Sequence, residues 1–262
     1  MTNVVAMNPR VAHFPLIITA ILLCQLSACD AHAAADKVNP APVLVELFTS
    51  EGCSDCPPAD ALLARLDSSQ FVPGAYAIVL SEHVTYWNHL GWRDPFSFEE
   101  MDARQQEYSA RFGLNSVYTP QMVVDGAEQF VGSDRNALAH AIQGSAAREK
   151  IPVEIVEPRL QNGRATFSLR GAPANPALHW YAAIAADATR SEVSRGENAG
   201  RTLHHTAVVR VIKQLKRNAD TQEFSLPANA DATSSSGVRL IVFAVDAHTG
   251  RVVAAAQGII KR

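Results

Sequence analysis

The sequence predicts an α/β domain followed by a mostly β domain of sandwich type, behind a short N-terminal leader. Three observations lead to this prediction. Strand-like and helix-like runs alternate from residue 43 to about residue 149, strand-like runs separated by turns fill residues 151–262, and an apolar segment stands near the N-terminus. The chain has 262 residues, which is enough for one large domain or two ordinary ones, each with its own core.

The leader, residues 1–33, has the pattern of a secretory signal. Arg10 precedes an apolar run over 14–26, which is too short for a comfortable membrane span, and small residues follow. Two processing sites compete: a lipoprotein-like box that ends in Cys29, and an A-x-A site at 31–33. An uncleaved helical anchor is the third alternative. A secreted protein of the periplasm or cell envelope is expected, attached to the membrane only if Cys29 is lipidated.

The segment 43–149 alternates between strand and helix patterns. Short apolar, β-branched runs predict buried strands, and helical spacing or helix-favouring composition predicts helices. A turn signal at Asp125-Gly126 predicts a hairpin, and Ser133 is placed to cap the last helix. The predicted elements are strand 43–48, helix 57–66, strand 75–80, helix 98–112, strands 121–124 and 129–131, and a helix that ends near 147. This β, α, β, α, β, β, α order is that of the thioredoxin fold.

Residues 151–262 change to alternating strand-like runs with turns such as Asn162-Gly163 and Thr249-Gly250 between them. The predicted strands are 153–156, 165–169, 179–186, 207–212 and 239–245, with a last one near 252. We expect this segment to form a second, mostly β domain, built as a small sandwich.

Composition excludes two classes of protein. Lys and Arg number 23 against 26 Asp and Glu, so the surplus of positive charge that a nucleic-acid surface needs is missing. Four cysteines are too few for a disulfide-dense scaffold in a chain of this length. Cys24 and Cys29 lie in the leader, which leaves Cys53 and Cys56 as the pair of interest.

The pair forms a Cys53-Ser54-Asp55-Cys56 motif at the predicted strand-to-helix junction. The backbone N–H groups and positive dipole of a helix N-terminus favour a thiolate at the first cysteine. The spacing lets Cys56 attack a mixed disulfide on Cys53, so we predict Cys53 as the nucleophile and Cys56 as the resolving thiol. An inert structural disulfide and half of a zinc or copper site are the alternatives.

Thr119 and Pro120 open a predicted strand. In thioredoxin-fold proteins a cis proline at this place faces the cysteines and lines the substrate groove, so a cis Thr119-Pro120 bond is expected here. The alternative is a trans proline at a strand edge.

Glu46 is an acid within an otherwise apolar predicted strand. Buried carboxylates have raised pKa values and suit proton transfer near neutrality, which suggests Glu46 as the base for Cys56. Alternation along the strand allows the opposite reading, in which Glu46 points to solvent.

Aromatic residues gather in the segment 83–96. Trp87 and Trp92 are predicted to line the substrate surface beside the cysteines, and His83 to exchange protons with Cys53. A purely structural loop with a hydrogen-bonded histidine is the alternative. The polar stretch from 195 to 205 is expected to pack against the first domain and enclose the cysteines, or else to form a solvated hairpin loop.

Taken together, these motifs resemble a bacterial family of secreted thioredoxin-like proteins with a domain of unknown function. The runs that carry the resemblance are 45–60, Tyr86-Trp87 with 91–96, 118–126 and 195–201. The resemblance implies a thioredoxin-like domain with an appended β domain and a thiol-disulfide role. It implies no particular substrate.

The sequence therefore predicts a thiol-disulfide oxidoreductase that acts on the thiols or disulfides of client proteins and needs no cofactor. The alternative is a copper- or zinc-binding accessory protein that uses Cys53, Cys56 and a histidine such as His83. A binding module with one structural disulfide is the third possibility.

Overall fold

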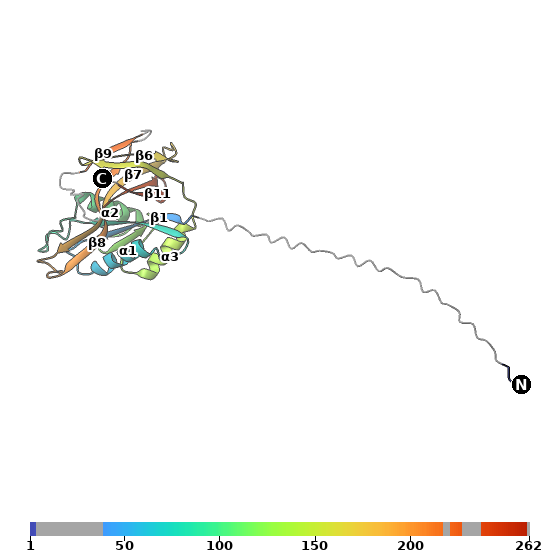
Figure 1. Ribbon diagram of the computed structural model, residues 1–262. Coiled ribbons are helices and arrows are strands. Elements are labelled where there is room, and N and C mark those ends of the chain that lie inside the picture. The colour runs from blue at the N-terminus through green and yellow to red at the C-terminus, as the bar shows by residue number, and fades with distance from the viewer. Residues whose placement is uncertain (4–38, 217–220, 227–236, 261–262) are drawn as a thin grey trace. The chain divides into compact units, whose positions relative to one another are not determined.

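One mixed sheet runs through most of the chain (Figure 1). The computed structural model describes residues 1–3, 39–216, 221–226 and 237–260. Within these residues the main sheet has eight strands in the order β11-β10-β7-β8-β2-β1-β3-β4. Its strands are β1 (Ala41–Thr49), β2 (Ala75–His83), β3 (Gln121–Val124), β4 (Glu128–Val131), β7 (Leu178–Glu192), β8 (Thr202–Gln214), β10 (Val238–Asp246) and β11 (Val252–Ile259).

A second, three-stranded sheet and three helices complete the described fold. The sheet has the order β5-β6-β9, with β5 (Glu154–Gln161), β6 (Arg164–Arg170) and β9 (Gln222–Ser225). The helices are α1 (Pro57–Ser69), α2 (Glu99–Phe112) and α3 (Arg135–Ala146). From β1 to α3 the elements follow the predicted β, α, β, α, β, β, α order.

The first half of the chain places helices on both faces of the main sheet. β1 is parallel to β2 and antiparallel to β3, which forms a hairpin with β4. α1 and α3 lie side by side (Figure 1), and Arg135 of α3 stacks over Phe71, just after α1. α2 lies on the other face, where Tyr108 meets Phe48 of β1 edge to face at 5.9 Å.

Local signals explain where the helices begin. α1 starts at Pro57-Pro58, where the missing N–H groups of proline cost little. The predicted cap of α3 was off by one residue: Asp134 caps this helix, and its side chain accepts hydrogen bonds from the N–H groups of Asn136 and Ala137.

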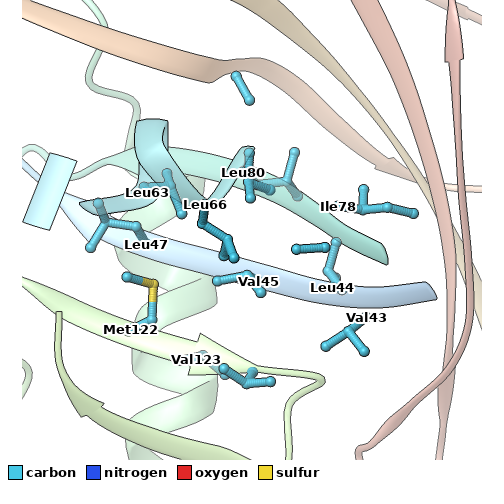
Figure 2. Close-up of a cluster of buried hydrophobic side chains, with 14 of the residues drawn as sticks. Val43, Leu44, Val45, Leu47, Leu63, Leu66, Ile78, Leu80, Met122 and Val123 are labelled. Atoms are coloured by element: carbon cyan, nitrogen blue, oxygen red, sulfur yellow. The ribbon is translucent and has the colours of Figure 1, made fainter. Parts of the chain in front are cut away.

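The core of the first half lies between β1 and α1. Figure 2 shows Leu63 and Leu66 of α1 over Leu47 of β1, with Met122 of β3 beside them. All four side chains are buried. This packing fixes the N-terminus of α1 above the end of β1, which is where the two cysteines lie.

The second half does not form the separate sandwich domain that was expected. β8 joins the sheet beside β2 and packs against α1, so the residues of both halves belong to one sheet and one compact unit. β10 shows the physical reason, because both of its faces are apolar. Ile241 and Phe243 belong to the core of the first half, whereas Leu240 and Val242 pack with Phe167 of β6. A strand of this kind needs cover on each side.

Among the helices that the structure describes, none is both long and apolar enough to cross a membrane. The predicted leader beyond its first three residues, including both processing sites and Cys29, lies outside the described residues.

Candidate functional site

Cys53 and Cys56 form a disulfide in the turn between β1 and α1. Their Cα atoms are 5.4 Å apart, and Cys56 is the N-cap residue of α1. Ser54 and Asp55 between them are exposed, but the cysteine side chains are not: Cys53 is 1% exposed and Cys56 is fully buried. The motif therefore reaches the surface at Ser54 and Asp55, while both cysteines are buried.

The loop between β7 and β8 packs against the cysteine turn, and we call it the cover loop (residues 193–201). The Asn198 side chain donates hydrogen bonds to the carbonyl oxygens of Glu51 and Cys53, both at 2.9 Å, and is itself fully buried. The N–H of Ser54 donates to Glu197 at 3.0 Å, and hydrogen bonds from the Ser54 side chain and this N–H lower the pKa of Glu197. The expectation that this polar loop packs against the first half is confirmed, and its contacts are to the cysteine turn.

Trp87 lies against Gly52 at the cysteine turn, and Thr119 is next to Trp87. The Thr119-Pro120 bond is cis, as predicted. Trp87 donates a hydrogen bond from Nε1 to the Thr119 hydroxyl at 2.8 Å. Gly52 permits this arrangement, because a Cβ atom there would lie 3.0 Å from the Cβ of Trp87. Pro120 itself packs near Ala59, in the first turn of α1.

Trp92 and His83 are linked to the cysteine turn by hydrogen bonds that involve Glu51, and not by a contact with a sulfur atom. Trp92 Nε1 donates to the Glu51 carboxylate at 2.8 Å, and the Glu51 N–H donates to Asp94 at 2.9 Å. His83 Nδ1 lies 2.7 Å from the same Asp94 oxygen. Burial alone would raise the pKa of Asp94, but the charge and hydrogen bond of His83 lower it. Trp92 and His83 therefore hold Glu51, at the start of the cysteine turn, in place.

His205 of β8 stands at the centre of this buried polar group. Its Nε2 lies 3.2 Å from Glu51 and its Nδ1 lies 3.6 Å from Asp60 of α1. Its ring also meets the ring of His83 edge to face, with 4.6 Å between centroids. Burial would lower the pKa of His205, but the adjacent Asp60 and Glu51 carboxylates raise it to about 10. His205 is therefore an imidazolium at neutral pH.

Sequence reasoning passed over Glu51 and Asp60. The available signal was their position, two residues before Cys53 and four residues after Cys56. His205 was part of the polar stretch that was singled out, but only the fold shows that it lies next to both acids.

Glu46 is buried, as predicted, but the structure does not bring it to the cysteines. The side chains of Glu46 and Phe48 point to the same face of β1, which is the face that α2 covers. Cys56 lies at the start of α1, on the opposite face. The carboxylate accepts hydrogen bonds from Arg104 and Tyr108 of α2. Glu46 is therefore paired with Arg104 and Tyr108, and it lies on the wrong side of β1 to exchange a proton with Cys56.

Glu82 of β2 is buried next to Glu46 and Arg104. Burial and the nearby Glu46 charge hold the pKa of Glu82 well above its ordinary range, although Arg104 acts in the opposite direction. Within the described residues, no group of three or more His, Cys, Asp or Glu side chains is arranged to hold a metal ion.

Two solved structures have a similar fold. Protein AGR_C_4864 from Agrobacterium tumefaciens aligns with a TM-score of 0.62 and 23% identity, over 84% of this chain and 94% of that one. HBP35 of Porphyromonas gingivalis aligns with a TM-score of 0.55 and 14% identity, over 84% of this chain and 76% of that one. At these identities the likeness is one of fold alone. No curated protein matches the sequence significantly.

A family model describes a larger share of the chain than any single motif does. The model for DUF1223, a protein of unknown function, matches residues 44–245 and so spans the cysteine turn, α1 and the cover loop. The chain belongs to the DUF1223 family.

Proposed function

We propose that this protein is a thiol-disulfide oxidoreductase and that its active pair is Cys53 and Cys56. The observation that carries the proposal is the position of the disulfide, between the end of β1 and the first turn of α1 and above a buried acid-base group. Helix N-termini stabilise thiolates, and perturbed titratable groups gather at functional sites. In this proposal the elements from β1 to α3 are a thioredoxin-like unit that the later strands extend.

The exchange reaction runs in two balanced steps. In the reduced protein, the Cys53 thiolate attacks a client disulfide, so that a bond forms between Cys53 and one client sulfur while the other client sulfur leaves as a thiolate. Cys56 then loses its proton and attacks Cys53, which restores the Cys53–Cys56 disulfide and releases the second client sulfur. Two electrons pass from the cysteine pair to the client. A partner dithiol returns the pair to its reduced form, and the same steps in reverse oxidise a client dithiol.

The cover loop sets a condition on this reaction. Because Cys53 is 1% exposed, a protein-sized client reaches its sulfur only when residues 193–201 move aside. The two Asn198 hydrogen bonds and the Glu197 contact hold the closed form. Thr119 and Trp87 lie at the edge of the same turn, where a bound client would contact them.

The predicted leader agrees with this chemistry. Protein disulfides form and persist in the periplasm and cell envelope, because the cytosolic systems that keep thiols reduced do not act there. We expect the clients to be proteins of the same compartment.

A redox titration tests the proposal. Every variant carries Cys24→Ser and Cys29→Ser, so that only Cys53 and Cys56 react. The pair should equilibrate with a glutathione buffer at a reduction potential above about −300 mV, and the protein should catalyse reduction of insulin by dithiothreitol. Cys53→Ser should abolish this catalysis. A potential below about −300 mV, together with catalysis no faster than in Cys53→Ser, would identify a structural disulfide instead.

A further inference from the structure

We infer that Asp60 accepts the proton of Cys56 when Cys56 resolves the mixed disulfide, and that His205 and Glu51 position Asp60 for this step. The inference rests on the proposed function and names the base for its second step. It replaces Glu46, which the sequence had suggested for this role, with an acid on the correct side of β1.

The helix places Asp60 next to Cys56. Cys56 has helical backbone angles, φ −77° and ψ −37°, and the Asp60 N–H donates to the Cys56 carbonyl at 3.1 Å. Residues four positions apart share one face of a helix, with Cβ atoms about 5–6 Å apart. Both side chains are buried, since Cys56 is 0% and Asp60 6% exposed. The carboxylate therefore lies on the same helix face as the Cys56 side chain and has little contact with solvent.

One oxygen of Asp60 lacks a partner in the oxidised protein. Asp60 Oδ1 is buried and accepts no hydrogen bond within the described residues. A buried polar atom without a partner costs free energy. His205 Nδ1, 3.6 Å from the other Asp60 oxygen, also lacks a hydrogen bond within the described residues. Cys56 carries no proton while it is bonded to Cys53, but the reduced form has an S–H group at this place. The vacant acceptor fits a donor that exists only after reduction.

Asp60 is one of two acids that lie beside His205. His205 faces the acids Glu51 and Asp60, so two carboxylates share one imidazolium.

Three more titratable or charged groups surround His205. His83 packs against its ring and is itself paired with Asp94. Arg210 stacks over Phe96, whose ring lies 6.0 Å from that of His205. Asp60 and Glu51 are the groups that raise the pKa of His205.

The step balances without a further reagent. The S–H bond of Cys56 breaks, its proton moves to Asp60 Oδ1, and the electron pair stays on sulfur. The new thiolate bonds to Cys53 and the bond from Cys53 to the client sulfur breaks. The client leaves as a thiolate that water protonates, and Asp60 returns its proton to solvent. Asp60 is then a catalytic residue, and His205 and Glu51 are positioning residues.

Stopped-flow kinetics with 5,5′-dithiobis(2-nitrobenzoate) separate the two steps. Reduced protein that carries Cys24→Ser and Cys29→Ser, the reference for every variant here, releases one thionitrobenzoate when Cys53 is modified and a second when Cys56 resolves the adduct. Asp60→Asn should slow the second release by roughly 10- to 100-fold near neutral pH, leave the first release unchanged, and regain speed at high pH, where hydroxide takes the proton. Asp60→Glu should restore part of the rate.

Two further variants keep the test decisive. His205→Gln should slow the second release less than Asp60→Asn and shift its pH profile, which a merely structural role would not do. Asp67→Asn is the matched control, because Asp67 lies on the same helix but pairs with Arg239, and its profile should follow the wild type. Second-release profiles of Asp60→Asn and His205→Gln identical to the wild type would overturn the inference and leave the proposed function intact. Absence of the first release in the wild type would overturn both.

Discussion

Within the described residues, two buried clusters of acidic side chains lie next to strands of the main sheet. One cluster is paired with an arginine and the other with a histidine. The Arg104 cluster comprises Glu46, Glu82, Arg104 and Tyr108 and faces α2. The His205 cluster comprises Glu51, Asp60, His83, Asp94 and His205 and lies beneath the cysteine turn. Arginine keeps its charge at any physiological pH, whereas histidine gains or loses a proton.

The difference shows that burial alone does not identify a functional acid. Glu46 and Asp60 are both buried carboxylates near β1 and α1. Glu46 has an Arg104 guanidinium and a Tyr108 hydroxyl as fixed partners, but Asp60 has a titratable imidazole and one vacant oxygen. Only the second cluster combines proton-exchanging groups with a position beside the sulfur atoms.

Loss of the fixed cation should have the largest effect on stability. Arg104→Met leaves Glu46 and Glu82 buried without their cation and also removes the stacking of the guanidinium over Tyr108 and Phe243. We expect the free energy of unfolding to fall by about 3–5 kcal/mol, measured by denaturant unfolding. The thiol-disulfide exchange rate of the folded fraction should stay unchanged. A loss below about 1 kcal/mol would mean that this cluster is not structural.

The titratable cation should make stability depend on pH. Because the pKa of His205 is raised from 6.5 to about 10 in the folded protein, its contribution is complete below about pH 6.5 and is lost as the pH rises towards 10. The unfolding free energies of wild type and His205→Gln should differ by on the order of 3 kcal/mol near pH 6. The difference should shrink with rising pH. A difference that is constant from about pH 6 to about pH 10 would contradict a buried imidazolium.

The cover loop should contribute the smallest of the three stability effects. Asn198→Ala removes the hydrogen bonds to the carbonyl oxygens of Glu51 and Cys53, at a cost of about 2 kcal/mol. It should also speed reduction of the disulfide by thioredoxin-sized reductants more than reduction by dithiothreitol. Glu197→Gln is the control, since its amide oxygen can still accept from Ser54. Equal acceleration for large and small reductants would argue against a cover.

Much of the first half was predictable because its signals are local. The order of elements from β1 to α3, the turn at Asp125-Gly126 and the cysteine pair at the start of α1 follow from short runs of residues. The cis Thr119-Pro120 bond was expected from the same fold reasoning.

The remainder depends on contacts between distant parts of the chain. Alternation along β1 shows that Glu46 and Leu47 face opposite sides, but only tertiary packing shows which side carries α1. The insertion of β8 beside β2 brings His205 to Glu51, 154 positions away in sequence. Asp60 was inconspicuous because an acid is common in the first turn of any helix.

Trapping of a mixed disulfide tests the central claim most directly. Cys56→Ser, in a chain that also carries Cys24→Ser and Cys29→Ser, cannot resolve an adduct on Cys53. The account predicts that this variant accumulates covalent complexes with envelope proteins, seen on non-reducing gels and lost on reduction, and that adding Cys53→Ser removes them. If Cys56→Ser forms no more reducible complexes than the variant that also lacks Cys53, the protein does not act by thiol-disulfide exchange.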